Sequence, residues 1–291
     1  MSLINPTAAT LSSAKSRRFG GLGISGGVCA AVIALAALVA LIGSNIAPHD
    51  PEATSFDNAW VGPGQVAGHP LGFDGQGRDL LSRLLAGART AVLGPLAVVI
   101  IAVVLGVVLA VFAAWKGGRT DGFLGSLFDL LFAFPGILLA ILAAAVFGKG
   151  IRSAVIALSV AYIPFVARTL RSAALKVRSQ AYIAALEVQG QSALLICLRH
   201  IIPNMASLVV AQATTLFGYA MVDLAAISFL GLGVQAPAAD WGYMVNENQS
   251  GILQGYPLST ILSGVCIVAV VVAVNVLGER LHQRSSVGAR A

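Results

Sequence analysis

The sequence has few charged residues. Only 10% of its 291 residues are Asp, Glu, Lys or Arg, whereas 57% are hydrophobic and the mean hydropathy is +0.87. Soluble domains contain about 25% charged residues. This shortage of charge excludes an ordinary soluble globular protein and indicates a chain whose long apolar segments lie in a lipid bilayer.

Motifs for catalysis and cofactor binding are also missing. There is no GxxxxGK[S/T] phosphate loop, no HExxH and no CxxC, and the three cysteines form no disulfide framework. The four histidines lack the spacing of metal ligands. We therefore predict no metal site, no cofactor and no enzymatic activity in this chain. If it moves a solute uphill, the energy comes from a gradient or a partner.

Six apolar segments are long enough to cross a bilayer. A hydrocarbon core of about 30 Å requires about 20 apolar residues of helix. The alternating pattern of a membrane β-barrel is absent from the sequence. These observations predict an all-α, polytopic membrane protein with six transmembrane helices, at approximately 24–46, 90–115, 123–147, 153–175, 205–233 and 257–278.

The basic residues are distributed unevenly around these segments. Six spans place the N-terminus, the second and fourth connections and the C-terminus on one side, with 13 of the 18 lysines and arginines. By the positive-inside rule this side is the cytoplasm, so both termini are predicted to be cytoplasmic. The net charge of +6 therefore reports membrane topology and gives no indication of nucleic-acid binding.

The chain divides into four parts by composition. We predict a cytoplasmic N-terminal segment, a first helix with an external loop and a short helix, a main transmembrane domain, and a cytoplasmic tail, at 1–23, 24–89, 90–280 and 281–291. The sequence "RDLLSRLLAGAR" has leucines on one helical face and a predicted Asp79–Arg83 pair on another. Its helix either lies in the outer membrane interface or extends the second span. Pro135 predicts a kink in the third span.

A polar insert interrupts the main domain at about 176–204. Its sequence "YIAALEVQGQSALLICLRHIIPN" predicts two short helices that meet at Gly190, where a glycine accommodates a sharp turn. Ser192 is a candidate cap for the second helix. Leu194, Leu195 and Leu198 form an apolar patch, and Pro203 ends the insert. Such a pair of helices fits a groove on a cytoplasmic partner or rests on lipid headgroups, and the pattern alone favours neither.

The insert resembles the coupling loop of bacterial ABC importer permeases in its glycine and in the proline of "RHIIPN". Three stretches narrow the resemblance to permeases of dipeptide, oligopeptide and nickel importers: "HPLGFDGQGRDLLSRLLAGAR", "FDLLFAFPGILLAILAAAVFG" and "AISFLGLGVQAPAADWG". The likeness covers nearly all of the chain after residue 20 and is greatest to the second permease of the pair, which has the short external loop. Where the family has Glu-Ala-Ala, this chain has Ala184, Ala185 and Leu186, with Glu187 next.

The resemblance implies a type I ABC importer transmembrane domain that takes up di- or oligopeptides across the bacterial inner membrane. It implies a second permease subunit that shares the translocation path and an external substrate-binding protein. Two cytoplasmic ATPase domains, on separate chains or fused, would hold ATP and Mg²⁺. The alternatives are a nickel or nickel-chelate importer and a gradient-driven secondary carrier.

Two sets of residues are candidates for this function. The ATPase-coupling set comprises Ala184, Ala185, Glu187, Gly190, Leu194, Leu195, Arg199, His200 and Pro203. Aromatic or ionisable residues within spans and near kinks are candidates for the translocation path, namely Phe134, Tyr162, Phe217 and Asp223. The other acidic residue within a span, Asp129, lies near its cytoplasmic start, facing water or capping a neighbouring helix.

Overall fold

The computed structural model describes residues 23–288, and within this range every regular secondary-structure element is a helix. Five helices are long and apolar enough to cross a membrane, and a bent pair of helices brings the number to six. The predicted all-α fold is thereby confirmed. Residues 1–22 and 289–291, with most of the predicted N-terminal segment and the end of the predicted tail, lie outside the described residues. The five single helices are α1 (Gly23–Ile46), α2 (Leu80–Lys116), α5 (Ile151–Arg178), α9 (Ala206–Phe229) and α12 (Leu258–Gly288).

Helix α2 is a single helix of 37 residues that includes the "RDLLSRLLAGAR" stretch. It is about 55 Å long and so exceeds the bilayer core, which settles the two alternatives in favour of an extended second span. The carboxylate of Asp79 caps α2 by accepting a hydrogen bond of 2.8 Å from the backbone N–H of Ser82. The predicted Asp79–Arg83 pair is therefore wrong, because Asp79 serves as the cap and Arg83 pairs with Glu247 instead.

The third predicted span is broken rather than kinked. Helices α3 (Gly118–Phe132) and α4 (Gly136–Phe147) meet at an angle of 82°. Pro135 lacks the N–H needed to continue α3 and disfavours a helical conformation at the preceding residue, so the chain stops there and starts again. Two ion pairs, Asp129–Arg168 and Asp121–Arg171, join α3 to α5. Asp129 thus pairs with a neighbouring helix.

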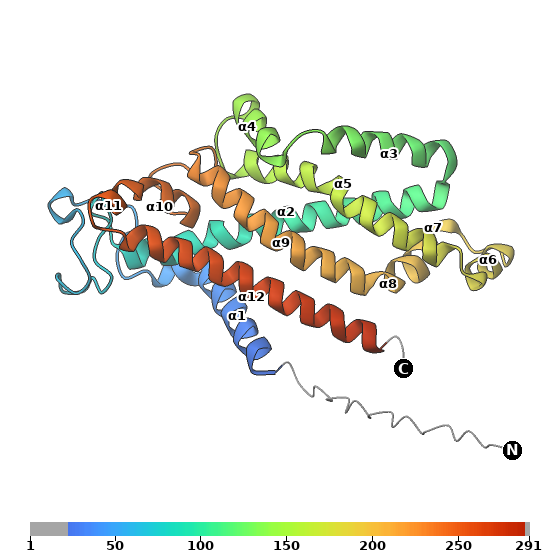
Figure 1. Cartoon of the computed structure of the whole chain (residues 1–291), viewed down its shortest axis with the longest axis horizontal. Coiled ribbons are helices and arrows are strands. Elements are labelled where there is room, and N and C mark those ends of the chain that lie inside the picture. The colour runs from blue at the N-terminus through green and yellow to red at the C-terminus, as the bar shows by residue number, and fades with distance from the viewer. Residues whose placement is uncertain (1–22, 289–291) are drawn as a thin grey trace, which may run out of the picture.

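Helix α2 lies at the centre of the bundle and packs along α5, α1 and α9 (Figure 1). A Cβ atom on Gly106 would lie 2.6 Å from Cγ1 of Val166, so this glycine allows α2 and α5 to approach closely. Small residues at helix contacts are the usual device for tight packing in membranes. The buried core between α2 and α5 contains Ala102, Ala110, Ala114, Leu170 and Ala174.

The bundle has two different ends (Figure 1). The loop end carries residues 47–79, which include the 3₁₀-helix η1 (Phe56–Asn58), together with α10 (Trp241–Glu247) and α11 (Gln249–Leu253). The elbow end carries the elbow, defined as residues 179–205, with α6 (Ala181–Val188), α7 (Ala193–Ile196), the π-helix η2 (Cys197–Ile201) and α8 (Ile202–Asn204). The start of α1 and the later part of α12 lie together, because Arg280 donates to the hydroxyl of Ser25 at 2.5 Å.

Candidate functional site

The elbow turns at Gly190, as predicted from the sequence. Gly190 has a φ of +78°, a backbone conformation that favours glycine. The N–H of Gln191 donates to the carbonyl of Leu186 at 3.1 Å, and the N–H of Gly190 donates to that of Glu187 at 3.0 Å. This pair of bonds is a Schellman motif, which satisfies the last carbonyls of α6 and fixes the direction in which the chain leaves it.

The second half of the elbow is capped and then continues towards α9. The hydroxyl of Ser192 accepts a hydrogen bond of 3.4 Å from the N–H of Leu195 and caps α7, as predicted. Asn204 closes the elbow by donating to the hydroxyl of Tyr182 at 3.2 Å and to the carbonyl of His200 at 2.6 Å. Pro203 does not end the helical path, because it occupies the first turn of α8, where no N–H is needed.

Buried side chains anchor the elbow to the bundle. Ile183, Ile196, Ile201 and Met205 are each at most 2% exposed. Ile201 and Met205 belong to the core between α2 and α5. At the end of α5, Arg178 donates to the carbonyl of Ala114 at 2.6 Å, near the end of α2. The elbow is therefore packed onto the core of the bundle rather than hanging loosely from it.

Four other side chains of the elbow are apolar and exposed. We call this set the elbow face: Val188, Leu194, Leu195 and Leu198, which are 88%, 69%, 44% and 56% exposed. Among the other predicted coupling residues, those exposed beside it are Ala184, Ala185, Glu187, Gly190, Arg199 and Pro203. His200 is half-buried against the edge of the Tyr182 ring. Exposed apolar groups gathered in one place are typical of interaction sites.

Two of the four predicted path residues meet inside the bundle. The hydroxyl of Tyr162 on α5 donates to the carboxylate of Asp223 on α9 at 2.6 Å. Phe217, six residues earlier on α9, packs between two core clusters. Phe134 is 51% exposed at the break between α3 and α4 and takes no part in the Tyr162–Asp223 hydrogen bond.

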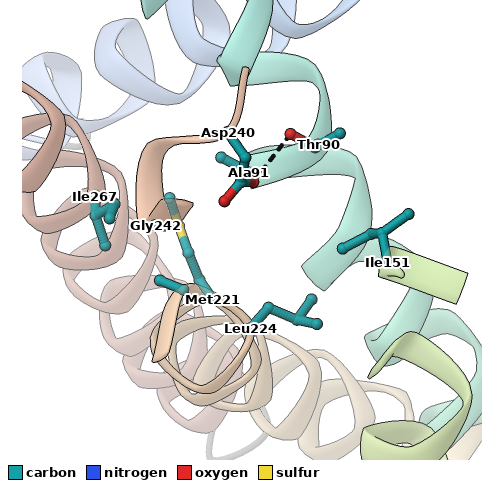
Figure 2. A pocket seen from close by; sticks show the side chains of 9 residues that line it. Thr90, Ala91, Ile151, Met221, Leu224, Asp240, Gly242 and Ile267 are labelled. Carbon is teal, nitrogen blue, oxygen red and sulfur yellow. Dashed lines mark hydrogen bonds between the residues drawn. The ribbon is translucent and has the colours of Figure 1, made fainter. Parts of the chain in front are cut away.

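Two cavities lie in other parts of the bundle. The smaller, of about 10 Å³, lies where Thr90 and Asp240 meet Leu224 of α9 and Ile151 of α5 (Figure 2). Thr90 donates to the carboxylate of Asp240 at 2.9 Å, and burial raises the pKa of Asp240. The larger, of about 340 Å³, lies between α9 and α12 and is lined by Ala211, Thr214, Thr215, Asn275, Gly278 and Glu279. None of the four predicted path residues lines either cavity.

A buried charge network at the loop end was missed by the sequence analysis. Arg78 binds the carboxylates of Asp74 and Glu247 at 2.7 and 2.8 Å, and Arg83 binds Glu247 at 2.8 Å. Burial opposes ionisation of Arg78, but hydrogen bonds with Glu247 and Asp74 raise its pKa above the usual value. The i,i+4 spacing of Asp74 and Arg78 was a local signal, whereas Glu247 lies 169 residues away in the sequence.

Two of the stretches that carry the family resemblance, 69–89 and 226–242, pack against each other at this end. Arg83 donates to the carbonyl of Pro237 at 3.2 Å, and the indole N–H of Trp241 donates to the carbonyl of Leu84 at 2.9 Å. A Cβ atom on Gly87 would lie 3.2 Å from the Trp241 ring. The two stretches therefore form one structural unit, which positions the start of α2.

Comparisons with known proteins agree with this arrangement. Residues 102–287 match the family described as binding-protein-dependent transport system inner membrane component. The dipeptide transport system permease protein of Alkalihalophilus pseudofirmus is 34% identical over 242 residues, which are 81% of this chain and 79% of that protein. The glutathione transport system permease protein of Escherichia coli is 36% identical over 250 residues, which are 86% and 82% of the two chains.

A solved structure shares the fold. The MetNI methionine ABC transporter, in an inward-facing conformation, aligns with a TM-score of 0.57 over 69% of this chain and 95% of that one. The sequence identity is 18%, so the likeness concerns the arrangement of helices.

Proposed function

The chain belongs to the family of binding-protein-dependent transport system inner membrane components and is a permease of an ABC importer, and we propose that it imports small peptides. The resemblance inferred from the quoted stretches is confirmed by this membership. Relatives with about a third of their residues identical are named for dipeptide and glutathione transport. Glutathione is itself a tripeptide, so both names point to short peptides as the cargo class.

The elbow end is proposed to face the cytoplasm and the loop end the outside of the bacterial inner membrane. Support comes from the charges at the elbow end, which include Lys116 at the end of α2 and Lys176 and Arg178 at the end of α5. Cytoplasmic loops carry an excess of lysine and arginine. The start of α1 and Arg280 of α12 lie at the same end, so both termini are proposed to be cytoplasmic.

Four further subunits or domains complete the proposed transporter. A second, homologous permease shares the translocation path, an external binding protein delivers the peptide, and two ATPase domains, separate or fused, bind ATP and Mg²⁺ beneath the elbow. This chain itself would hold no cofactor and perform no hydrolysis. The elbow face favours a protein contact over lipid headgroups, because its four apolar side chains protrude from a folded and internally bonded loop.

The coupling mechanism follows from how the elbow is held. ATP binding shifts the transporter between two arrangements only if the ATPases bind one arrangement better. The exposed Leu194 and Leu195 would contact the ATPases. A movement imposed there would reach the core between α2 and α5 through Ile201, which belongs to that core. The observation that carries this proposal is an exposed apolar surface on a firmly anchored loop.

Within the bundle, the Tyr162–Asp223 hydrogen bond is proposed to border the translocation path. It joins α5 to α9 through polar groups in two spans, where such groups usually have a functional role. Phe217 and Phe134 would add aromatic surface to the path. A peptide has an amine, a carboxylate and amide groups that this polar pair could contact.

The test substitutes valine for Gly190 and compares it with valine at Gly255. Both glycines have positive φ, +78° and +85°, and a Cβ atom at either meets nothing within 4 Å. Their backbone strain is therefore alike, but Gly255 lies at the loop end. The complex is purified with its ATPases, and the ATPase retained per permease is measured after washing.

We expect Gly190→Val to reduce ATPase retention by about tenfold, which corresponds to about 1.4 kcal/mol and lies within the usual range of backbone strain. Gly255→Val should retain the ATPase at the wild-type level. Equal retention by the two variants, in complexes with intact permease pairs, would contradict a docking role for the elbow.

A further inference from the structure

Two histidines that are distant in the sequence lie against one carboxylate at the loop end. Nδ1 of His69 lies 2.8 Å from Oδ1 of Asp79, and Nδ1 of His49 lies 3.8 Å from Oδ2 of the same residue. The two imidazole rings stack with their centroids 3.9 Å apart. All three potential ligand atoms lie within 4.8 Å of one another.

His49 is incompletely bonded in this cluster. Its Nδ1 atom is buried and, among the described residues, has no hydrogen-bond partner. A buried polar atom without a partner is unfavourable, so such an atom calls for a physical explanation. A cation placed between His49 and Asp79 would give this nitrogen a bond.

The carboxylate of Asp79 is held firmly in position by its neighbours. Its Oδ2 atom accepts hydrogen bonds from the backbone N–H and the hydroxyl of Ser82, at 2.8 and 2.6 Å. The same hydroxyl accepts a bond of 3.1 Å from the backbone N–H of His49. Outer bonds of this kind orient the ligands of metal sites.

We propose that His49, His69 and Asp79 bind a divalent transition metal of the Zn²⁺ class. Two imidazole nitrogens and one carboxylate oxygen are ligands that Zn²⁺ accepts, with a fourth position left for water. In a tetrahedral site with bonds of about 2.0–2.1 Å, neighbouring ligand atoms lie about 3.3–3.4 Å apart. Nδ1 of His69 and Nδ1 of His49 lie 2.8 and 3.8 Å from the two oxygens of Asp79, so the three side chains are close enough to share one ion after a rearrangement.

Binding requires one visible rearrangement. Each Nδ1 lone pair lies in the plane of its own ring, so the stacked rings have to open from their present angle of 22° to share one ion. The side chain of His49 is 38% exposed and is the one that would have to turn, whereas Asp79 is 2% exposed and stays in place. Ca²⁺ and Mg²⁺ are not expected to bind, because they prefer oxygen ligands.

The bound metal would join three segments of the loop end. His49 follows α1, His69 lies in the long loop, and Asp79 caps α2. The sequence predicted no such site, because the ligands are 20 and 10 residues apart and match no local metal motif. This inference does not depend on the cargo or on the ATPase partners.

The experiment measures Zn²⁺ binding by the full-length chain in its complex, which is purified through an affinity tag that contains no histidine. The complex is stripped with a chelator and titrated with Zn²⁺ alone, and bound metal is counted per permease. Co²⁺ is then substituted, because its visible absorption reports tetrahedral coordination by nitrogen and oxygen. His49→Gln and His69→Gln remove ligands, and His200→Gln removes a histidine at the elbow as the matched control.

We expect the wild-type complex to bind one more Zn²⁺ than the His49→Gln complex. The affinity for Zn²⁺ should fall by more than about 100-fold in either ligand variant, because loss of a residue that only hydrogen-bonds to a metal ligand already costs about 10–100-fold. His200→Gln should bind as the wild type does. His49→Gln leaves the Asp79 cap in place, so loss of folding does not mimic loss of the site. Binding that is undetectable in the wild type, or unchanged in His49→Gln, would overturn the proposal.

Discussion

The two ends of the bundle differ in how they bury charge and where they expose apolar side chains. At the loop end, Arg78 and Arg83 are at most 1% exposed, and each is paired with a carboxylate of the same chain. At the elbow end, Leu194 is 69% exposed and Val188 is 88% exposed. The loop end thus compensates its buried charges within the chain, although Phe56 and Leu253 are 75% and 91% exposed there. The elbow carries its exposed apolar side chains close together in the sequence, within residues 188–198.

This difference shows that the loop end satisfies its own buried charges. Buried charges are tolerated only where partners compensate the loss of hydration, and the loop end supplies its own partners. The elbow face has no covering segment from α6, α7 or α8, although the same loop buries Ile183 and Ile196 fully. A partner subunit is therefore expected to cover the elbow face, whereas the buried charges of the loop end are paired inside this chain.

The largest expected effect comes from breaking the charge network at the loop end. Arg83→Met leaves Asp74 and Glu247 with one guanidinium in place of two, in a buried site. Removal of one partner of a buried ion pair typically costs about 3–5 kcal/mol. We expect a loss of this size in the free energy of unfolding, measured by denaturation of the protein in mixed micelles.

The matched control is Arg152→Ala, which removes an exposed arginine at the start of α5, near the same end. This change should alter the free energy of unfolding by less than about 0.5 kcal/mol. Equal effects of the two variants would show that the loop end is not held by its buried charges.

The long helices and the turn of the elbow could be predicted from local sequence signals. Each span is set by its own apolar residues, the turn by Gly190 and the next helix start by Ser192, so no distant contact had to be known. The loop end was harder to predict because its bonds join Arg83 to Glu247, and Thr90 to Asp240, across about 150 residues or more. No periodicity in a sequence reports such distant pairings.

Two departures have specific physical causes. Asp79 looked like an i,i+4 partner of Arg83, but its carboxylate lies where it caps α2, and a cap competes with a side-chain pair for the same oxygen atoms. Pro135 was expected to kink a helix, but the chain bends by 82° there because Pro135 adopts an extended conformation and ends one helix before the next begins at Gly136. The ATPase-coupling residues are exposed, apart from the half-buried His200, as docking to a partner would require. Their role in coupling stays a prediction.

The next largest effect is expected within α7, where a buried and an exposed residue lie two positions apart. Ile196 is buried completely and Leu194 is 69% exposed. Ile196→Ala should lower the free energy of unfolding by about 2–5 kcal/mol, because it leaves a cavity where the elbow meets the core. Leu194→Ala should change it by less than about 0.5 kcal/mol and yet weaken binding of the ATPase, measured by co-purification.

The two readouts separate anchoring from docking. If Leu194→Ala destabilises the isolated permease as much as Ile196→Ala does, the elbow face is part of the fold rather than a surface for a partner. If neither variant changes ATPase retention, the contrast between the two ends has no bearing on coupling.

The smallest effect is expected at the cap of α7. The hydroxyl of Ser192 accepts from the N–H of Leu195 at 3.4 Å in an exposed position, whereas Asp79 caps α2 at 2.8 Å in a buried one. Ser192→Ala should cost about 0.5–1 kcal/mol, the lower part of the range for caps, and so raise hydrogen exchange at the Leu195 amide about two- to fivefold. Ser192→Asp keeps an acceptor for the same N–H and adds a charge that favours the start of a helix, so it should restore slow exchange. Exchange as fast in Ser192→Asp as in Ser192→Ala would mean that the elbow is held in shape by its buried isoleucines alone, without help from its cap.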